Sequence, residues 1–339
     1  MELDQLKWTD VRQLGVLGKG WTDTESPYDR LPARAKDLVR DEVWNLSRHS
    51  SGLRVQFVTD SPVIAADWTL PADEPIAMDH MPATGKSGLD LYTRHKGSWH
   101  WLGVARLDVQ GRNRRILAQG LHPARRECML YLPLYNRVES LSIGIVPEAS
   151  LTKPRPRSRK LICYYGTSIV QGGCASRPGM TYPAILGRVL DVDFLNLGFS
   201  GNAQMEPELA QLLAELDPAV YVLDALPNVP VKEVVQRAEP FIRTLRAVRP
   251  KTPIVLVENI VYQNACLVKE RMLEVTTRNR GLRKVYEKLR REKMKGLRYV
   301  PSKDLLGHDG EATVDGAHFT DLGFMRMAQG LLPVLKQLL

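Results

Sequence analysis

The sequence is poor in cysteine and in long apolar runs, and each shortage argues against a class of protein. Its four cysteines are scattered and include no Cys-x-x-Cys pair, which argues against a disulfide framework and against a zinc site. No apolar run is long enough to cross a bilayer, so we predict no membrane span. The first residues lack the basic and apolar regions of a secretory signal. This indicates a cytoplasmic protein, or a mature or trimmed form of an exported one.

Basic residues are in surplus, and the formal net charge is +9. Much of the surplus lies in residues 153–160, which are typical of a linker, and in 269–298, which are typical of a solvated helix face. A basic surface attracts anionic polymers, but no nucleic-acid motif and no stripe of aromatic residues accompanies it. We therefore predict no nucleic-acid partner. The sequence carries no signal for the oligomeric state.

Residues 1–152 have the pattern of an antiparallel β-sandwich. Short runs that are β-branched or alternating are separated by turn residues, as in sandwich domains. These runs lie at 53–58, 63–68, 89–92, 99–102, 128–132 and 140–146. One helix is expected between residues 33 and 46. The charged, proline-spaced residues 153–160 have nothing to bury and predict a linker.

Residues 161–339 show a different period and predict a second domain. Strand-like runs lie at 161–166, 193–198, 220–224, 254–258 and 297–301. Helical stretches alternate with them, at 182–190, 207–216, 231–248, 271–293 and 322–338. Strands and helices in alternation predict an α/β fold: a parallel five-stranded sheet with helices on both faces.

A candidate nucleophile follows the first predicted strand of this second domain. The apolar run 161–166 ends at Gly166, and Thr167 and Ser168 come next. In open α/β sheets, functional sites lie at the carboxyl ends of the strands, so we expect Ser168 to be exposed there and able to attack a substrate. Gly-Thr-Ser is also an ordinary turn sequence, and the tripeptide alone leaves both interpretations open.

A candidate base and its carboxylate lie in a loop before the last predicted helix. Asp315 and His318 are separated by Gly316 and Ala317, so a tight turn can fold the carboxylate back onto one imidazole nitrogen. That contact would fix the tautomer and leave the other nitrogen free to accept a proton from Ser168. The alternative is that both are loop polars and that Asp321 caps the last helix.

Two further loops carry candidate donors for an oxyanion. Gly201, after the run 193–198, can present its backbone N–H with no side chain in the way. Asn228, after the run 220–224, offers a side-chain N–H. Both loops are also acceptable as plain turns, because glycine and asparagine are common turn residues.

In their order along the chain, these blocks resemble the four sequence blocks of the SGNH (GDSL-type) hydrolases. They are Gly166-Thr167-Ser168, Ser200-Gly201-Asn202, Asn228 and Asp315-x-x-His318, and they span the domain from about 160 to 339. In the N-terminal half, Gly88-Leu89-Asp90-Leu91-Tyr92 resembles the domain that precedes some of these hydrolases. The resemblance implies the two-domain subgroup with a GxDLY-type N-terminal domain: a jelly-roll-like β-sandwich followed by a flavodoxin-like SGNH domain.

The resemblance also implies a role for each block. Ser168 would be the nucleophile, His318 the general base and Asp315 its orienting carboxylate. The oxyanion donors would be the backbone N–H groups of Ser168 and Gly201 and the side chain of Asn228.

Two positions depart from the family pattern. Thr167 stands where the family name has an aspartate. Asn228 lacks the glycine that usually precedes it by two residues, so Asn202 is the alternative side-chain donor. The Gly-x-Ser-x-Gly elbow of the α/β-hydrolases is absent around Ser168.

The function implied is that of a serine esterase acting on a small acyl ester, with an O-acetylated carbohydrate as the expected substrate. No metal or organic cofactor is signalled. An acyltransferase that uses the same triad is the alternative enzyme. A carbohydrate-binding protein with an inactive hydrolase domain is the alternative from another class, and the presence of all three triad residues argues against it.

Overall fold

The computed structural model describes residues 2–107, 109–155 and 160–339, so part of the expected linker, 156–159, lies outside the described residues. The chain forms two compact units, and neither is one continuous stretch. Unit 1 comprises Met1–Ala33, Ser47–Ser158 and Ala175–Gly179, and unit 2 comprises Arg34–Leu46, Arg159–Cys174 and Met180–Leu339. Two segments, Arg34–Leu46 and Ala175–Gly179, therefore belong to a different unit from the one that their place in the sequence predicts.

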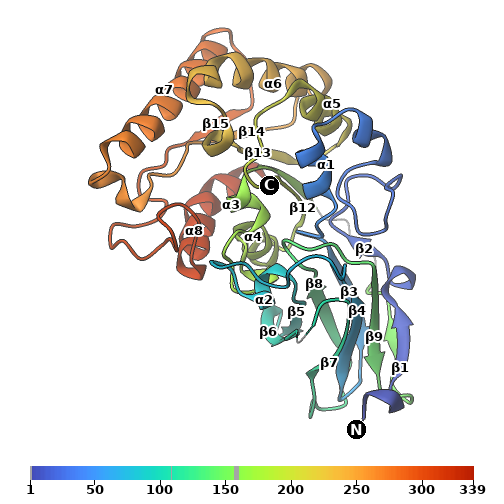
Figure 1. Cartoon of the computed structure of the whole chain (residues 1–339). Coiled ribbons are helices and arrows are strands. Elements are labelled where there is room, and N and C mark those ends of the chain that lie inside the picture. Colours follow the sequence, from blue (N-terminus) through green and yellow to red (C-terminus); the bar gives the residue numbers. More distant parts are fainter. Residues whose placement is uncertain (1, 108, 156–159) are drawn as a thin grey trace. The chain divides into compact units, whose positions relative to one another are not determined.

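Unit 1 is a β-sandwich, as predicted. Its strands are β1 (Lys7–Asp10), β2 (Val16–Leu17), β3 (Arg54–Thr59), β4 (Ile64–Thr69), β5 (Asp90–His95), β6 (Ser98–Val104), β7 (Arg112–Ala118), β8 (Arg126–Tyr131), β9 (Ser140–Ile145) and β10 (Leu151–Thr152). They form antiparallel sheets of order β1-β9-β4-β7 and β10-β3-β8-β5-β6, with β2 on β3 (Figure 1). The pairs are nested, β1 with β9, β3 with β8, β4 with β7 and β5 with β6, which is the pattern of a jelly roll.

The core of unit 1 draws on both sheets. Phe57 of β3 and Leu130 of β8 belong to the same fully buried cluster as Trp68 of β4 and Ile143 of β9. This burial of apolar side chains is the main force that holds the sandwich closed. A short helix, α2 (Ala83–Lys86), lies between β4 and β5.

Unit 2 contains the predicted parallel sheet. Its strands are β11 (Leu161–Gly166), β12 (Asp193–Gly198), β13 (Val220–Asp224), β14 (Ile254–Val257) and β15 (Leu297–Val300). The order β12-β11-β13-β14-β15 is the flavodoxin-like doubly wound arrangement. Every residue of β13 and β14 is buried, which explains their continuous apolar runs in the sequence.

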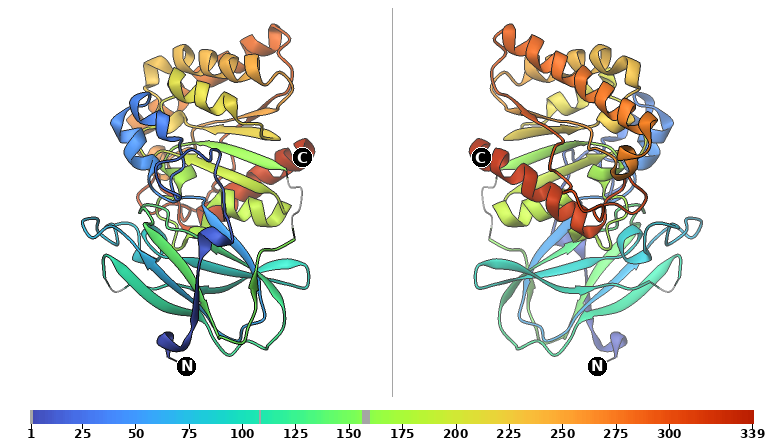
Figure 2. Two further views of the ribbon diagram at one scale, coloured as in Figure 1. Left: turned by 90° about the vertical axis from the view of Figure 1, so that its right-hand side faces the viewer. Right: turned by 90° about the vertical axis from the view of Figure 1, so that its left-hand side faces the viewer.

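Helices cover both faces of this sheet. They are α1 (Asp41–Ser47), α3 (Ser168–Gln171), α4 (Tyr182–Leu190), α5 (Pro207–Glu215), α6 (Val234–Val248), α7 (Lys269–Arg291) and α8 (Asp321–Leu338). Figures 1 and 2 show α4 and α8 on one face and α5, α6 and α7 on the other. The expected helix between 33 and 46 is a 3₁₀ turn, Ala33–Asp37, followed by α1. Thr320, rather than Asp321, caps α8, because its side chain accepts a hydrogen bond from Gly323 N.

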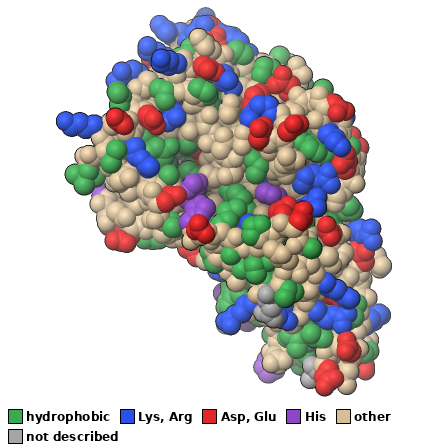
Figure 3. Space-filling model, in the orientation of Figure 1, with side chains coloured by type: hydrophobic (Ala, Val, Ile, Leu, Met, Phe, Trp, Pro, Cys, Tyr) green, Lys and Arg blue, Asp and Glu red, His purple; other side chains and the backbone are tan. Residues whose placement is uncertain are grey.

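The basic stretch 269–298 comprises α7, the turn that follows it and the first two residues of β15. Figure 3 shows lysine and arginine side chains over α6 and α7 with acidic side chains among them. Glu239 of α6 pairs with both Arg243 and Lys288, each at 2.8 Å. The stretch is thus a charged helix face with acidic partners. Among the described residues, no helix has the length and apolar character needed to cross a membrane.

Candidate active site

The candidate nucleophile lies where β11 passes into α3. Gly166 is required because a Cβ there would lie 2.3 Å from the carbonyl oxygen of Asp224 on the neighbouring strand. Thr167 caps α3, since its Oγ1 accepts a hydrogen bond from Ile169 N at 3.2 Å. An aspartate can cap a helix in the same way, which explains how threonine can replace the family's aspartate.

Ser168 is the first residue of α3, at the carboxyl end of a strand as predicted. The expectation that it would be exposed was wrong, because the residue is only 7% exposed. Its Oγ is engaged within the protein, since His318 Nε2 lies 2.8 Å away.

His318 is positioned by a turn that closes on itself. Val314 N donates to His318 O at 2.8 Å, and Thr313 and Phe319 form an isolated antiparallel bridge. Inside this turn, Asp315 Oδ2 lies 2.7 Å from His318 Nδ1. Asp315 Oδ1 accepts from the backbone N–H of Ala317 at 3.0 Å and of His318 at 2.8 Å. The structure therefore brings the three side chains of the expected triad into one hydrogen-bonded line.

The carboxylate of Asp315 is held in its charged form. Burial alone would raise its pKa, but the hydrogen bonds from the His318 ring and from the N–H groups of His318 and Ala317 outweigh burial and lower the pKa to about 2. At neutral pH, His318 Nδ1 thus faces a negative charge, which favours a proton on that nitrogen.

Gly201 lies in a turn after β12, with a φ of +71° that suits glycine. Ser200 N donates to Gln171 Oε1 of α3 at 3.0 Å, so this turn is attached to the helix that begins with Ser168. In the part of the chain that the structure describes, no group accepts a hydrogen bond from Gly201 N.

The two asparagines considered as side-chain donors differ in their hydrogen bonds. Asn202 uses both ends of its amide: Nδ2 donates to Ser200 O at 2.9 Å, and Oδ1 accepts from Arg40 at 2.7 Å. Asn228 uses only its oxygen, which accepts from Ala203 N at 3.3 Å, and its Nδ2 has no partner among the described residues. Asn228 is therefore the better candidate of the two.

Three residues near this site were not predicted from the sequence. Gln171 binds the turn of Gly201, and Arg40 binds Asn202. Gln263 Oε1 accepts from Thr313 N at 3.0 Å and from Thr313 Oγ1 at 2.8 Å. All three bond to residues within two positions of Gly201 or Asp315, and none is a candidate site residue in the sequence.

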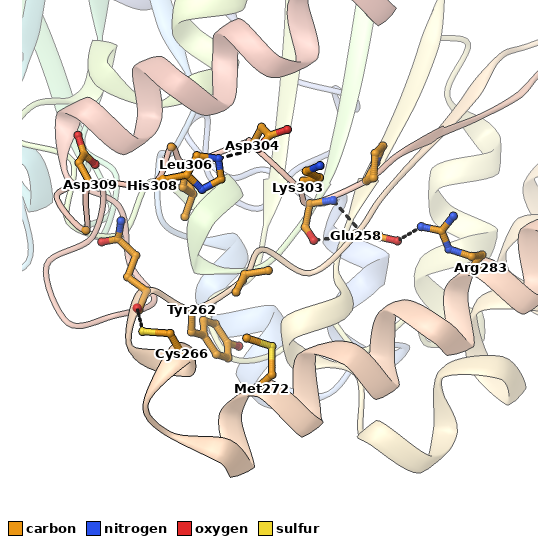
Figure 4. A pocket seen from close by; sticks show the side chains of 16 residues that line it. Glu258, Tyr262, Cys266, Met272, Arg283, Lys303, Asp304, Leu306, His308 and Asp309 are labelled. Atoms are coloured by element: carbon orange, nitrogen blue, oxygen red, sulfur yellow. Dashed lines mark hydrogen bonds and ion pairs between the residues drawn. The ribbon is translucent and has the colours of Figure 1, made fainter.

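A cavity of about 720 Å³ opens in unit 2 beyond the carboxyl ends of β14 and β15. Figure 4 shows Tyr262, Met272 and Leu306 around it together with charged side chains. Four of these polar side chains form two pairs: Glu258 with Arg283 at 2.8 Å, and the His308 ring with Asp304 at 2.7 Å. No triad residue lines this cavity.

In unit 1, the motif 88–92 has a structural role. Asp90 is fully buried and accepts hydrogen bonds from Trp101 Nε1 at 3.0 Å, Arg177 at 2.8 Å and Gly179 N at 2.8 Å. Its carboxylate thereby anchors the segment Ala175–Gly179, which follows the Ser168 block in the chain.

Comparisons with known proteins agree with this fold. The sequence model of the GDSL-like lipase/acylhydrolase family matches residues 159–336, more than half of the chain. The GxDLY model, which describes the N-terminus of SGNH-hydrolase-type esterases, matches residues 6–151. The fold is thus that of the SGNH-type ester hydrolases. The chain belongs to the GDSL-like lipase/acylhydrolase family and carries the GxDLY N-terminus.

Solved structures extend the comparison over the whole chain. A Bacteroides ovatus protein described as a GDSL-like lipase is 34% identical, with a TM-score of 0.93 over 98% of both chains. The salicylyl-acyltransferase SsfX3 of a tetracycline biosynthetic pathway is 19% identical, with a TM-score of 0.77 over 98% of this chain and 97% of its own. An acetyl xylan esterase from Butyrivibrio proteoclasticus is 12% identical, with a TM-score of 0.58 over 98% of both chains. The last two share the fold. No curated protein matches the chain.

Proposed function

We propose that the protein is a serine esterase in which Ser168 is the nucleophile, His318 the general base and Asp315 the carboxylate that orients it. The observation that carries this proposal is the continuous line of hydrogen bonds from Ser168 Oγ to His318 Nε2 and from His318 Nδ1 to Asp315, at 2.8 Å and 2.7 Å. With the proton on Nδ1, the lone pair of Nε2 faces the serine hydroxyl, as general-base catalysis requires.

The proposed reaction proceeds through an acyl-enzyme. Ser168 Oγ attacks the ester carbonyl as its proton passes to His318 Nε2, and Asp315 stabilises the imidazolium that forms. The tetrahedral intermediate collapses when Nε2 returns the proton to the leaving alcohol. Water then gives a proton to Nε2 as it attacks the acyl group. The second tetrahedral intermediate collapses when Nε2 returns that proton to Ser168 Oγ, which releases the acid and restores Ser168.

The oxyanion of each tetrahedral intermediate needs donors that are already in place. We assign this role to the backbone N–H groups of Ser168 and Gly201 and to Asn228 Nδ2. The lack of a described acceptor for Gly201 N and for Asn228 Nδ2 supports the assignment, because an oxyanion donor must be available to the substrate.

We further propose that the substrate is a small acyl ester, an O-acetyl group on a carbohydrate. Two findings support this choice: the GxDLY model describes esterases, and an acetyl xylan esterase shares the fold of both units. The site itself supplies the chemistry of ester cleavage and needs no metal or organic cofactor for the steps above.

An acyltransferase is the second candidate, because SsfX3 matches the fold with the higher TM-score of the two distant relatives. The same acyl-enzyme would then react with an acceptor alcohol instead of water. Product analysis with an added acceptor alcohol separates the two. Free acetate as the main product supports the hydrolase, and acetylated acceptor as the main product supports the transferase.

The test of the esterase proposal is hydrolysis of p-nitrophenyl acetate by the wild type and by Ser168→Ala. Ser140→Ala on β9 is a matched serine-to-alanine control in unit 1. We expect turnover by the wild type and the control and none by Ser168→Ala. Equal turnover by Ser168→Ala contradicts the proposed nucleophile. A folded wild type that cleaves no ester, acetyl or longer, contradicts the esterase and favours the carbohydrate-binding alternative.

A further inference from the structure

The segment Arg34–Leu46 precedes most of the sandwich in sequence, yet it belongs to unit 2. Two arginines of this segment pair with glutamates at the two ends of α5. Arg34 pairs with Glu215 at the end of α5, whereas Arg40 pairs with Glu206, the residue before α5 begins. The GDSL-like family model covers only residues 159–336, so both arginines lie outside it.

Arg40 makes two hydrogen bonds to Asn202, the residue that follows Gly201 in the 200–202 turn. Its guanidinium donates to Asn202 Oδ1 at 2.7 Å and to the backbone oxygen of Asn202 at 2.9 Å. One bond holds the Asn202 side chain and the other the peptide that follows Asn202. The same side chain donates from Nδ2 to Ser200 O at 2.9 Å, and that oxygen belongs to the peptide that carries the Gly201 N–H. A planar guanidinium can make such paired bonds in a fixed geometry, whereas an ammonium group cannot.

Further contacts hold the Arg40 side chain in place. Its Nε and its second terminal nitrogen both donate to Glu206 Oε1, at 2.9 Å and 2.5 Å. Glu42 also lies within ion-pair distance, at 3.6 Å. Its backbone is fixed because Arg40 O accepts from Trp44 N at 2.9 Å, the first hydrogen bond of α1. The guanidinium therefore has little freedom to leave Asn202.

The carboxylate of Glu206 links this cluster to the nucleophile strand. Tyr165, three residues before Ser168, donates its hydroxyl to Glu206 Oε2 at 3.4 Å and accepts from Met205 N at 2.9 Å. Glu206 Oε2 also accepts from Gln204 N at 3.1 Å. The turn of Gly201 is thus tied to β11 and to the segment of Arg40.

We propose that Arg40 is a positioning residue for the oxyanion site: through Asn202 it fixes the direction of the Gly201 N–H. This inference rests on the proposed function. Its physical basis is that an oxyanion donor acts only when it is aimed before the reaction, and a small misplacement costs much of the rate. The pair is partly shielded from solvent, since the side chains of Arg40 and Glu206 are 36% and 13% exposed. Solvent weakens the contribution of a partly exposed ion pair to stability, so activity is expected to suffer more than folding.

The test compares Arg40→Met, Arg40→Lys and Arg34→Met on p-nitrophenyl acetate. Arg34→Met is the matched control, because it removes an arginine–glutamate pair from the same segment without touching Asn202. We expect Arg40→Met to lower kcat by about 10- to 100-fold with KM nearly unchanged, since oxyanion donors act in the transition state. Arg40→Lys is expected to recover only part of the loss, and Arg34→Met to behave as the wild type.

Two readouts separate positioning from a loss of structure. The affinity for a trifluoromethyl ketone, which forms a tetrahedral adduct, should fall in parallel with kcat. Free guanidinium at millimolar concentration should restore part of the activity of Arg40→Met, because a cavity of about 240 Å³ lies beside Arg40 and Glu206. In a double-mutant cycle with Asn202→Ala, the two losses should not add.

Three results overturn the inference: an unchanged kcat in Arg40→Met, an equal loss in Arg34→Met, or full additivity with Asn202→Ala. If Arg40→Met does not fold, Arg40→Lys and Asn202→Ala carry the same comparison. A wild type that cleaves no ester contradicts the proposed function itself. An active wild type with an equally active Arg40→Met variant contradicts only the role of Arg40.

Discussion

The two turns that complete the candidate site are held in different ways. The 315–318 turn is stabilised largely from within: Asp315 contacts His318 and two backbone N–H groups three residues or fewer away. The 200–202 turn relies on Gln171, Arg40 and Asn228, which come from three separate segments. The proposed proton-transfer half of the site is therefore a local motif, whereas the proposed oxyanion half depends on contacts between distant parts of the chain.

Asp315→Asn and His318→Ala test the local half, where we expect the largest effects. His318→Ala removes the proposed base, and Asp315→Asn removes the charge that keeps the proton on Nδ1. Each is expected to lower kcat by about 10³-fold or more, as in serine triads generally. Steady-state hydrolysis of p-nitrophenyl acetate measures both. A loss below tenfold in either variant contradicts its place in the triad.

Asn228→Ala and Asn202→Ala test the oxyanion half. Asn228→Ala is expected to lower kcat by about 10²–10³-fold, because it removes a donor to the transition state. Asn202→Ala is expected to cost less, since its amide is engaged within the protein. The reverse order of the two losses would show that Asn202, and not Asn228, is the side-chain donor.

Much of this site was accessible from the sequence, and the reason lies in chain distance. The β11 run, the Gly166-Thr167-Ser168 block and the pair Asp315 and His318 are each contiguous or nearly so, and their local pattern predicted their structure. Arg40 bonds to a residue 162 positions away. No periodicity or short motif encodes such a partner, so arginine at that position is indistinguishable in sequence from a solvated surface residue.

Prediction of the fold from the sequence has the same limit. The alternating runs of unit 2 predicted all five strands of its sheet. Strand β7 was missed because its sequence begins Arg112-Asn113-Arg114-Arg115 and lacks an apolar pattern. In the structure it pairs with β4 along its length and places Leu117 in the core of the unit. Asp67 on β4 also pairs with Arg112 and Arg114 across the sheet, at 2.6 Å and 3.0 Å.

Gln263→Leu tests whether the 315–318 turn also depends on a residue from another segment of the chain. Its Oε1 holds Thr313, two residues before Asp315, so the substitution loosens the base of the turn. We expect kcat to fall by about tenfold through misplacement of His318. Gln263→Glu is the matched control, because a carboxylate can accept the same two bonds. Equal rates in Gln263→Leu and the wild type would show that the turn is self-sufficient.

The smallest expected effect is on the free energy of unfolding, through the titration of Asp224. Burial raises the pKa of Asp224 to about 7, although the hydrogen bond from Tyr182 opposes this. An unfolded aspartate titrates near 3.9, so between about pH 4 and 7 the native state keeps a proton that the unfolded chain has released. The free energy of unfolding should therefore fall as pH rises through this range, by at most about 1.4 kcal/mol per pH unit.

Asp224→Asn removes this titration. Urea unfolding of both proteins at pH 5, 6 and 7 measures it, and the stability of the wild type relative to the variant should decline with rising pH. A difference that stays constant over this range contradicts a protonated Asp224 in the native state.

The most direct test of the central claim is the mass of the intact protein after reaction with a serine-directed fluorophosphonate. The hydrogen-bonded line from Ser168 to Asp315 predicts one covalent adduct on the wild type, located on Ser168 by peptide mapping, and none on Ser168→Ala. It also predicts much slower labelling of His318→Ala. An adduct on a different residue, or equal labelling of Ser168→Ala, would contradict the account.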